Sequence, residues 1–168
     1  MARRKHEKKR GKIAMLTFEK SFVIDAPVEA VFAYTADPTH LPEYFRGVER
    51  VSKVRRLPNQ GYSFQFVDKI VGERFVATGE CTEFVPNERL VVRLHAEPED
   101  ETRTTTFERL NSDSTRMTCV EEYTIHGGFI GELGEAFLAE YLHHAGEMSN
   151  AALKAHIEAS GSGGKTAH

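Results

Sequence analysis

The stretch SFVIDAPVEAVFAYTADPTHLPEYFRGVERV, residues 21–51, decides the fold of this chain. It opens as a strand, turns, and continues as a helix, because Pro27 suits the first helical turn, where its missing N–H leaves no bond unmade. Asp37 precedes a proline and is therefore biased away from helical geometry, which ends this helix. Residues 41–45 predict one further helical turn before a strand resumes at 47–54. We expect the two short helices to close one end of a cup that the rest of the chain supplies.

The remainder of the chain reads as a strand-rich segment followed by one long helix. In residues 62–125, short alternating patterns are separated by turn residues, and strands joined by short turns pair antiparallel. In residues 129–159, apolar side chains recur at steps of three and four, which predicts an amphipathic helix. Such a helix must bury its apolar stripe against one face of the sheet, so the predicted fold class is α+β. The predicted stripe consists of Ile130, Leu133, Phe137, Tyr141, Ala145, Met148 and Ala152.

The composition is that of one globular domain. The chain has 168 residues, of which 40% are apolar and 28% charged, and its net charge is −3. No apolar run approaches the roughly 18 residues that span a bilayer. We therefore expect a cytoplasmic protein with no transmembrane segment and no specific nucleic-acid partner. Cys81 and Cys119 have no CxxC partner and predict neither a zinc site nor a redox site.

Both ends of the chain differ in composition from the middle. Residues 1–14 are rich in Lys and Arg and poor in apolar groups, which predicts a disordered basic tail. Residues 160–168 are rich in Gly and Ser and predict a flexible tail. The folded unit is therefore expected to be one domain spanning residues 15–159. The basic tail leaves open a role in contacts with another macromolecule.

The predicted hairpins assign side chains to the two faces of the sheet, since residues directly opposite each other on paired strands share a face. Turns at 68–69, at 86–87 and centred on Asp113 predict the pairs Phe66 with Val71, Cys81 with Val92, and Phe107 with Cys119. The resulting apolar inner face carries Tyr62, Phe64, Phe66, Val71, Phe75, Ala77, Cys81, Leu90, Val92, Leu94, Phe107, Met117, Cys119, Tyr123 and Ile125.

Five polar residues fall on this inner face: Glu73, Glu83, Arg103, Thr105 and Glu121. We expect Glu73 and Glu83, which lie nearer strand ends, to reach water, which leaves Arg103, Thr105 and Glu121 as the informative three. The predicted register sets Thr105 opposite Glu121, with Arg103 one diagonal step away. Because a buried carboxylate without a partner costs on the order of several kcal/mol, we hypothesise an inward Arg103–Glu121 pair, joined by hydroxyls of Tyr123 and Tyr141. Glu121 and Arg103 are also the catalytic candidates, since burial raises the pKa of a carboxyl. A bulge that turns all three residues to solvent stays open as the alternative.

Several segments together resemble the START-like, or SRPBCC, superfamily, in particular its polyketide cyclase/dehydrase-type members. The segments are VIDAPVEAVFAYTADP (23–38), LPEYFRGV (41–48), TRMTCVEEYTIHGG (115–128) and the long terminal helix. The resemblance covers nearly all of residues 16–158. It implies a helix-grip fold, in which a curved seven-stranded antiparallel sheet wraps around the C-terminal helix, with two short helices between strands 1 and 2. It also implies an apolar cavity with Leu41, Tyr44 and Phe45 at its entrance.

Such a fold hosts several functions and does not select among them. The first expectation is a binding or carrier protein for a hydrophobic small molecule, such as a lipid, an isoprenoid or a polyketide-like aromatic. The alternatives are a cyclase, dehydratase or hydrolase acting on such a ligand, and a protein-interaction module; a homodimer also stays open. We expect no metal or cofactor. The expected ligand-binding residues are Tyr62, Phe64, Phe66, Phe75, Val92, Arg103, Thr105, Phe107, Met117, Cys119, Glu121, Tyr123, Phe137, Tyr141, His144 and Met148.

Overall fold

The computed structural model describes residues 14–97, 99–127 and 134–162. In chain order the elements are β1 (Ala14–Ile24), α1 (Val28–Ala36), the 3-10 helix η1 (Pro38–His40), α2 (Leu41–Tyr44), β2 (Val48–Arg56), β3 (Tyr62–Ile70), β4 (Glu73–Val85), β5 (Arg89–His95), β6 (Glu99–Asn111), β7 (Ser114–Ile125) and α4 (Glu135–Ser162). Secondary structure thus extends slightly beyond the predicted limits of 15–159 at both ends. The predicted tails otherwise lie outside the described residues.

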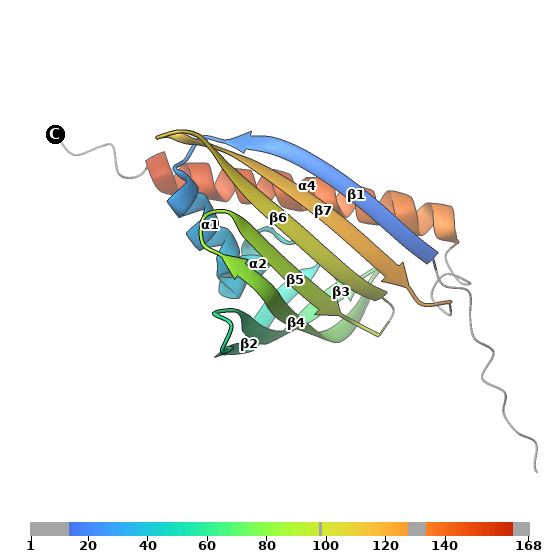
Figure 1. The fold of residues 1–168 in the computed structure, drawn as a ribbon. Coiled ribbons are helices and arrows are strands. Elements are labelled where there is room, and N and C mark those ends of the chain that lie inside the picture. The colour runs from blue at the N-terminus through green and yellow to red at the C-terminus, as the bar shows by residue number, and fades with distance from the viewer. Residues whose placement is uncertain (1–13, 98, 128–133, 163–168) are drawn as a thin grey trace, which may run out of the picture.

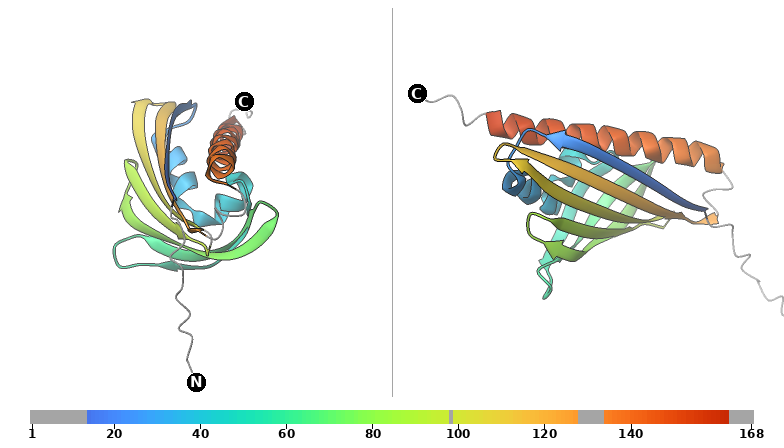
Figure 2. Two further views of the ribbon diagram at one scale, coloured as in Figure 1. Left: turned by 90° about the vertical axis from the view of Figure 1, so that its right-hand side faces the viewer. Right: turned by 45° about the horizontal axis from the view of Figure 1, so that its top comes forward.

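The strands form one antiparallel sheet of seven strands in the order β1-β7-β6-β5-β4-β3-β2. The sheet bends into a trough, and α4 lies lengthwise along its open side (Figures 1 and 2). The short helices α1 and α2 fill the end of the trough where α4 terminates, and both contact α4. The helix-grip α+β fold, with two short helices between strands 1 and 2, is therefore confirmed.

The stretch from 21 to 51 adopts the predicted strand–helix–helix–strand order. Pro27 has φ −58° directly before the first residue of α1, close to the value that its ring imposes. Phe32 of α1 packs edge-on against two phenylalanine rings of the sheet, with centroids 5.2 and 5.3 Å away. Asp37 is extended, and its carboxylate accepts a hydrogen bond of 2.9 Å from Thr39 N, which caps η1. These contacts hold the short helices against the end of the sheet.

The β3–β4 turn lies at Val71–Gly72 and not at the predicted residues 68–69. Val71 and Gly72 have φ values of 48° and 89°, and Gly72 adopts this geometry without a Cβ penalty. Phe66 is consequently paired with Ala77 and not with Val71. The partner has moved by an even number of residues along β4, so the residues that remain paired stay on their predicted faces, whereas Val71, predicted on the inner face, lies in the turn.

The β4–β5 pairing of Cys81 with Val92 is confirmed. A bulge between Cys81 and Glu83 lengthens the hairpin by one residue beyond the predicted turn. Because the bulge reverses the alternation, Glu83 is exposed and bonds Arg89 at 3.1 Å, whereas Phe84 packs on the core.

The β6–β7 register differs from the predicted one by two residues. Phe107 pairs with Met117 and not with Cys119, because the turn has two residues and an irregularity follows Arg109. The shift is again even and preserves the faces. Its consequence is that Arg103 lies directly opposite Glu121, in place of the predicted diagonal arrangement.

The apolar stripe of α4 is rotated by about one residue from the prediction, which is roughly 100° around the helix. Phe137 and Met148 are 49% and 41% exposed, and His144 is also exposed, so the predicted positions of these three residues are wrong. The leucines and the isoleucine of α4 are spaced by about whole helical turns and form a second apolar stripe, and this stripe faces the sheet. The buried residues of α4 are Leu138, Leu142, Gly146, Ser149, Asn150, Leu153 and Ile157. Ile130 and Leu133 lie outside the described residues.

The core consists of two apolar clusters. The larger one joins α1, α2, the sheet and Leu153 and Ile157 of α4. The smaller one gathers Tyr123, Leu138 and Leu142 near the start of α4. Along β7 and α4, the residues between the two clusters are polar or small. This interruption of the core positions the site described next.

Candidate functional site

An apolar cavity lies between the concave face of the sheet and the short helices. Six predicted ligand-binding residues line it: Tyr62, Phe64, Val92, Arg103, Thr105 and Met117. The other lining residues are Thr35, Pro38, Leu41, Tyr44, Phe45, Leu90, Leu94 and Leu153. The cavity holds about 40 Å³, which is room for roughly three water molecules at about 10–15 Å³ each. Of the described residues that line it, Arg103 is the one that carries a charge.

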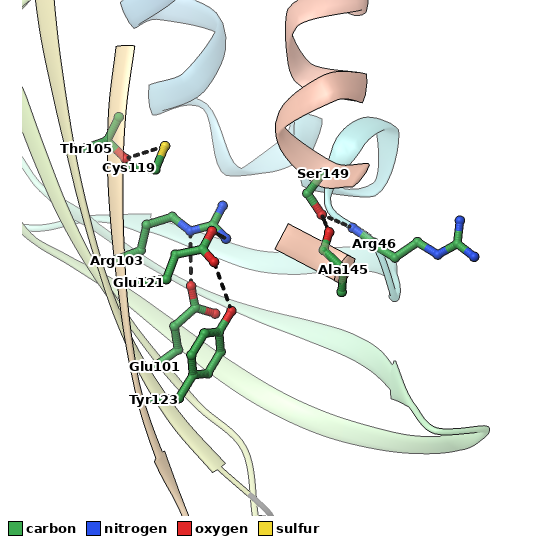
Figure 3. Close-up of polar contacts among 9 residues, drawn as sticks. All are labelled: Arg46, Glu101, Arg103, Thr105, Cys119, Glu121, Tyr123, Ala145 and Ser149. Carbon is green, nitrogen blue, oxygen red and sulfur yellow. Dashed lines mark hydrogen bonds and ion pairs between the residues drawn. The ribbon is translucent and has the colours of Figure 1, made fainter. Parts of the chain in front are cut away.

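Arg103 is held between two carboxylates on the concave face (Figure 3). Its Nε lies 3.0 Å from Glu101 Oε1, and its Nη2 lies 2.5 Å from Glu121 Oε1. Tyr123 donates its hydroxyl to Glu121 Oε2 at 3.4 Å. The hypothesised inward pair of Arg103 with Glu121, including the hydroxyl of Tyr123, is thereby confirmed, and the alternative of a bulge that exposes these residues is wrong.

The guanidinium stays charged although its side chain is only 12% exposed. Burial lowers the pKa of Arg103, but the charges of Glu121 and Glu101 outweigh it and raise the pKa well above its ordinary value. The guanidinium carbon also lies 4.2 Å from the centroid of the Phe45 ring, on whose face a cation is favoured. Arg103 is therefore a fixed positive charge whose position is set by three neighbours.

Gly146 of α4 makes room for this cluster. A Cβ at position 146 would lie 2.7 Å from Glu121 Oε2, which is closer than carbon and oxygen can pack. The glycine thus lets the helix backbone approach the carboxylate, which explains a residue that is unfavourable in a helix interior.

One turn further along α4, Ser149 Oγ donates to Ala145 O at 2.8 Å and accepts from Arg46 N at 2.8 Å. This pair of hydrogen bonds connects the segment after α2 to the helix (Figure 3).

A second cavity of about 30 Å³ adjoins the cluster, and acidic side chains line it. Burial raises the pKa of Glu99 to about 8, and the charges of Glu101 and Asp68 add to the shift. Burial likewise raises the pKa of Asp68 to about 6. For Glu101, burial raises the pKa above its ordinary value although Arg103 opposes the change. These carboxyls therefore hold protons at a pH where surface carboxyls do not.

Of the remaining predicted site residues, Glu121 belongs to the cluster around Arg103, and Phe137, His144 and Met148 are exposed on α4, whereas the others lie in the core or at the second cavity. Tyr123 and Tyr141 line the second cavity. The hydroxyl of Tyr141, however, accepts a hydrogen bond from Val71 N at 3.3 Å and does not join Glu121 as hypothesised. Phe66, Phe75, Phe107 and Cys119 pack in the larger core cluster and do not line the apolar cavity.

Glu99, Glu101 and Asp68 were missed by the sequence reasoning. On this strand the predicted inner face starts at Arg103, whereas β6 begins at Glu99. Extending the alternation by one step would have placed Glu101 on the same face as Arg103. Asp68 was assigned to a turn, which removed it from the inner face.

Neither a metal centre nor a membrane span is found in the parts of the chain that are described. Within residues 14–97, 99–127 and 134–162, no three His, Cys, Asp or Glu side chains are arranged to hold a metal ion. The helices of these ranges are all too short or too polar to cross a bilayer.

Comparisons with known proteins agree with this architecture. Residues 15–158 match the family described as polyketide cyclase / dehydrase and lipid transport. No curated protein matches the chain by sequence.

Several solved structures share the fold. The Zhui aromatase/cyclase from Streptomyces sp. R1128 superposes with a TM-score of 0.73 and 15% identity, over 86% of this chain and 94% of that chain. A START superfamily protein from Mycobacterium smegmatis gives 0.72 and 13%, over 84% and 97%. Protein CV1439 from Chromobacterium violaceum gives 0.61 and 23%, also over 84% and 97%. The predicted resemblance is thus confirmed, and the chain belongs to the polyketide cyclase / dehydrase and lipid transport family.

Proposed function

We propose that this protein binds a hydrophobic small molecule in the apolar cavity between the sheet and the short helices. The observation that carries the proposal is the cavity wall, which is apolar or aromatic except for Thr35, Thr105 and the single charge of Arg103. Binding sites for small molecules combine such a wall with a few fixed polar groups that orient the ligand. Arg103 is such a group, because the carboxylates of Glu101 and Glu121 fix its position.

Uptake of a lipid-sized molecule requires the cavity to open. A volume of about 40 Å³ holds a few waters and no larger ligand. Leu41, Tyr44 and Phe45 line the cavity from the short segment α2 and its C-cap, which the hydrogen bond from Arg46 N to Ser149 joins to α4. Outward movement of this segment would enlarge the cavity, because Leu41, Tyr44 and Phe45 form one of its walls, so α2 is the proposed gate.

A cyclase, dehydratase or hydrolase is the second candidate. It is favoured by Glu101, whose carboxyl has a raised pKa and contacts Arg103, and which can therefore exchange a proton near neutral pH. Against it, none of the described residues that line the apolar cavity carries a carboxylate. Binding without turnover therefore ranks first. Turnover of polyketide analogues that is lost in Glu101→Gln would reverse this ranking.

The cavity can be tested by filling it. Val92→Phe adds bulk inside, and we expect affinity for a neutral apolar probe such as Nile red to fall at least about tenfold, at a stability cost of about 1–3 kcal/mol. Val76→Phe is the matched control, since Val76 is 74% exposed on the same sheet. Native mass spectrometry of protein purified without denaturant would identify a bound hydrophobe. Undiminished probe binding by folded Val92→Phe would contradict the proposal.

A further inference from the structure

The second cavity is a neighbour of the apolar cavity, and the two share lining residues. Phe45 and Arg103 line both cavities and contact each other at the boundary, so a molecule that occupies both must displace the Phe45 ring, which belongs to the proposed gate segment. The two cavities differ sharply in character, because carboxyl groups line the second and are absent from the described lining of the first. This pairing suits an amphiphile with an apolar body and a small polar head.

Buried carboxyl groups outnumber buried cations at the second cavity. Glu99 and Glu101 are buried there and Asp68 is half-buried. The buried cation that faces them is Arg103, whose guanidinium is already engaged by Glu101 and Glu121. Lys69 and Arg46 also border the cavity, but both are exposed, and the side chain of Arg46 extends away from the cluster (Figure 3).

Glu99 is the residue that points to a ligand. It is only 8% exposed, and it borders the second cavity. Its Oε2 finds no hydrogen-bond partner among the described residues. An acceptor buried in this way is costly unless a donor reaches it, so a group that donates hydrogen bonds and carries positive charge would satisfy it.

The size and the lining of the second cavity indicate which kind of cation it can hold. Within the described residues, no three carboxylate, imidazole or thiol groups are placed to hold a metal ion. A volume of about 30 Å³ accommodates a head group no larger than a few waters, such as a primary ammonium. Rings of Phe45, Tyr123 and Tyr141 complete the wall, and aromatic faces favour organic cations.

We propose that the second cavity binds the primary ammonium group of a hydrophobic amine, whose apolar part occupies the first cavity. Glu99 accepts a hydrogen bond from the ammonium, and Asp68 and Glu101 supply further negative charge. The inference rests on the proposed function, because it names the chemical class of the ligand that the apolar cavity takes.

The test compares three probes with the same chain length: decylamine, 1-decanol and decanoate, each below its micellar concentration. Isothermal titration of the wild-type protein should show decylamine binding roughly ten- to hundredfold tighter than 1-decanol, the ratio expected of a charge-assisted hydrogen bond. Glu99→Gln should remove this preference and leave the affinity for 1-decanol unchanged. Glu122→Gln, which deletes an exposed carboxylate on the opposite face of the sheet, should keep it.

The outcomes separate the two proposals. Equal affinity for decylamine and 1-decanol, or tightest binding of decanoate on Arg103, overturns the amine proposal and leaves the hydrophobic site standing. Failure of all three probes to bind overturns both. A preference for decylamine that survives in Glu99→Gln shows that the ammonium binds elsewhere and also overturns the proposal.

The pH dependence provides an independent readout. An ammonium favours ionised carboxylates, so affinity for decylamine should rise as the pH increases from about 6 to about 8, the pKa values to which burial raises Asp68 and Glu99. Affinity for 1-decanol should not rise. The titratable and charged groups that border this cavity on the surrounding elements are Arg46, Asp68, Lys69, Glu101, Arg103, Tyr123 and Tyr141.

Discussion

At the scale of single residues, the site is a balance between one buried cation and several buried carboxyls. Arg103 accommodates Glu101 and Glu121 through charge-assisted hydrogen bonds, and without it both carboxylates would be buried with no counter-charge. Glu99 lies beyond the reach of the guanidinium and responds by holding a proton. Stability at this site therefore depends on both the arginine and the pH.

Removal of the cation should destabilise the fold. We expect Arg103→Leu to lower the free energy of unfolding by about 3–5 kcal/mol at pH 8, because two buried carboxylates lose their partner. The loss should be smaller at pH 5, where the carboxyl of Glu101, whose pKa burial raises, holds a proton and needs no counter-charge. Urea unfolding at the two pH values measures it. Arg93→Leu, on the exposed face of β5, should change stability by less than about 0.5 kcal/mol. An equally small effect of Arg103→Leu would show that the cluster does not hold the fold together.

Glu99 should make stability fall with rising pH. Its pKa is raised from an ordinary value of 4.5 to about 8, so between these values the folded state retains a proton that the unfolded state releases. The wild type loses stability across this window, whereas Glu99→Gln has no such titration. From pH 5 to pH 9, the free energy of unfolding of the variant should rise relative to that of the wild type by on the order of a few kcal/mol. Melting temperatures of both proteins across this pH range measure the change. If the stability difference between Glu99→Gln and the wild type did not change with pH, as we expect for Glu122→Gln, it would contradict a raised pKa of Glu99 in the folded state.

At the scale of elements, α4 is both a wall of the core and a support for the charged cluster. Its leucines and isoleucine bury against the sheet, while Gly146 and Ser149 face the polar interruption between the two apolar clusters. The glycine allows the backbone of α4 to lie close to Glu121, and the serine accepts a hydrogen bond from a backbone N–H of the neighbouring segment.

Gly146→Ala should destabilise the protein, although alanine is the better helix former by up to about 1 kcal/mol. The added Cβ displaces Glu121 Oε2, which weakens the bonds of Glu121 to Arg103 and Tyr123. We expect a net loss of about 1–2 kcal/mol in thermal or urea unfolding. Gly161→Ala, where nothing lies within 4 Å of the added Cβ, should be neutral or stabilising. If the two variants behaved alike, the close approach of α4 to Glu121 would not be needed.

At the scale of the whole molecule, the proposed function depends on how the trough opens. The sheet and α4 form a continuous frame, whereas α2 is a single helical turn (Figure 1). Arg46, two residues after α2, donates its backbone N–H to Ser149 of α4 (Figure 3). The cavity in its present form is too small for a lipid-sized guest, so the proposed uptake includes movement of this short segment. Local opening of a short element disturbs less of a folded domain than movement of the sheet or of α4.

Ser149→Ala should therefore speed ligand uptake. The substitution removes the acceptor of Arg46 N and loosens α2, while α4 keeps its own backbone bonds. In stopped-flow mixing with Nile red, the wild-type uptake rate should saturate with probe concentration because opening limits it, and Ser149→Ala should raise the plateau several-fold. Ser160→Ala is the control, since Ser160 Oγ makes the same kind of bond within α4, to His156 O, without contacting α2. A plateau unchanged by Ser149→Ala would place the gate elsewhere.

Several features of this protein were determined by the sequence itself. Proline positions, turn residues and the alternation of apolar side chains are local signals, and they predicted the order of elements, the faces of the strands and the Arg103–Glu121 pair. The two register errors were shifts by an even number of residues, and such shifts keep paired residues on their predicted faces because side chains alternate with a period of two.

Three features became clear from the packed fold alone: which side of α4 is buried, that Glu99 and Glu101 join the cluster, and how small the cavity is. The reason is physical: α4 carries two candidate apolar stripes, and the one that faces inward depends on the sheet it meets. The start of β6 and the volume left between side chains likewise depend on packing partners that are distant in sequence.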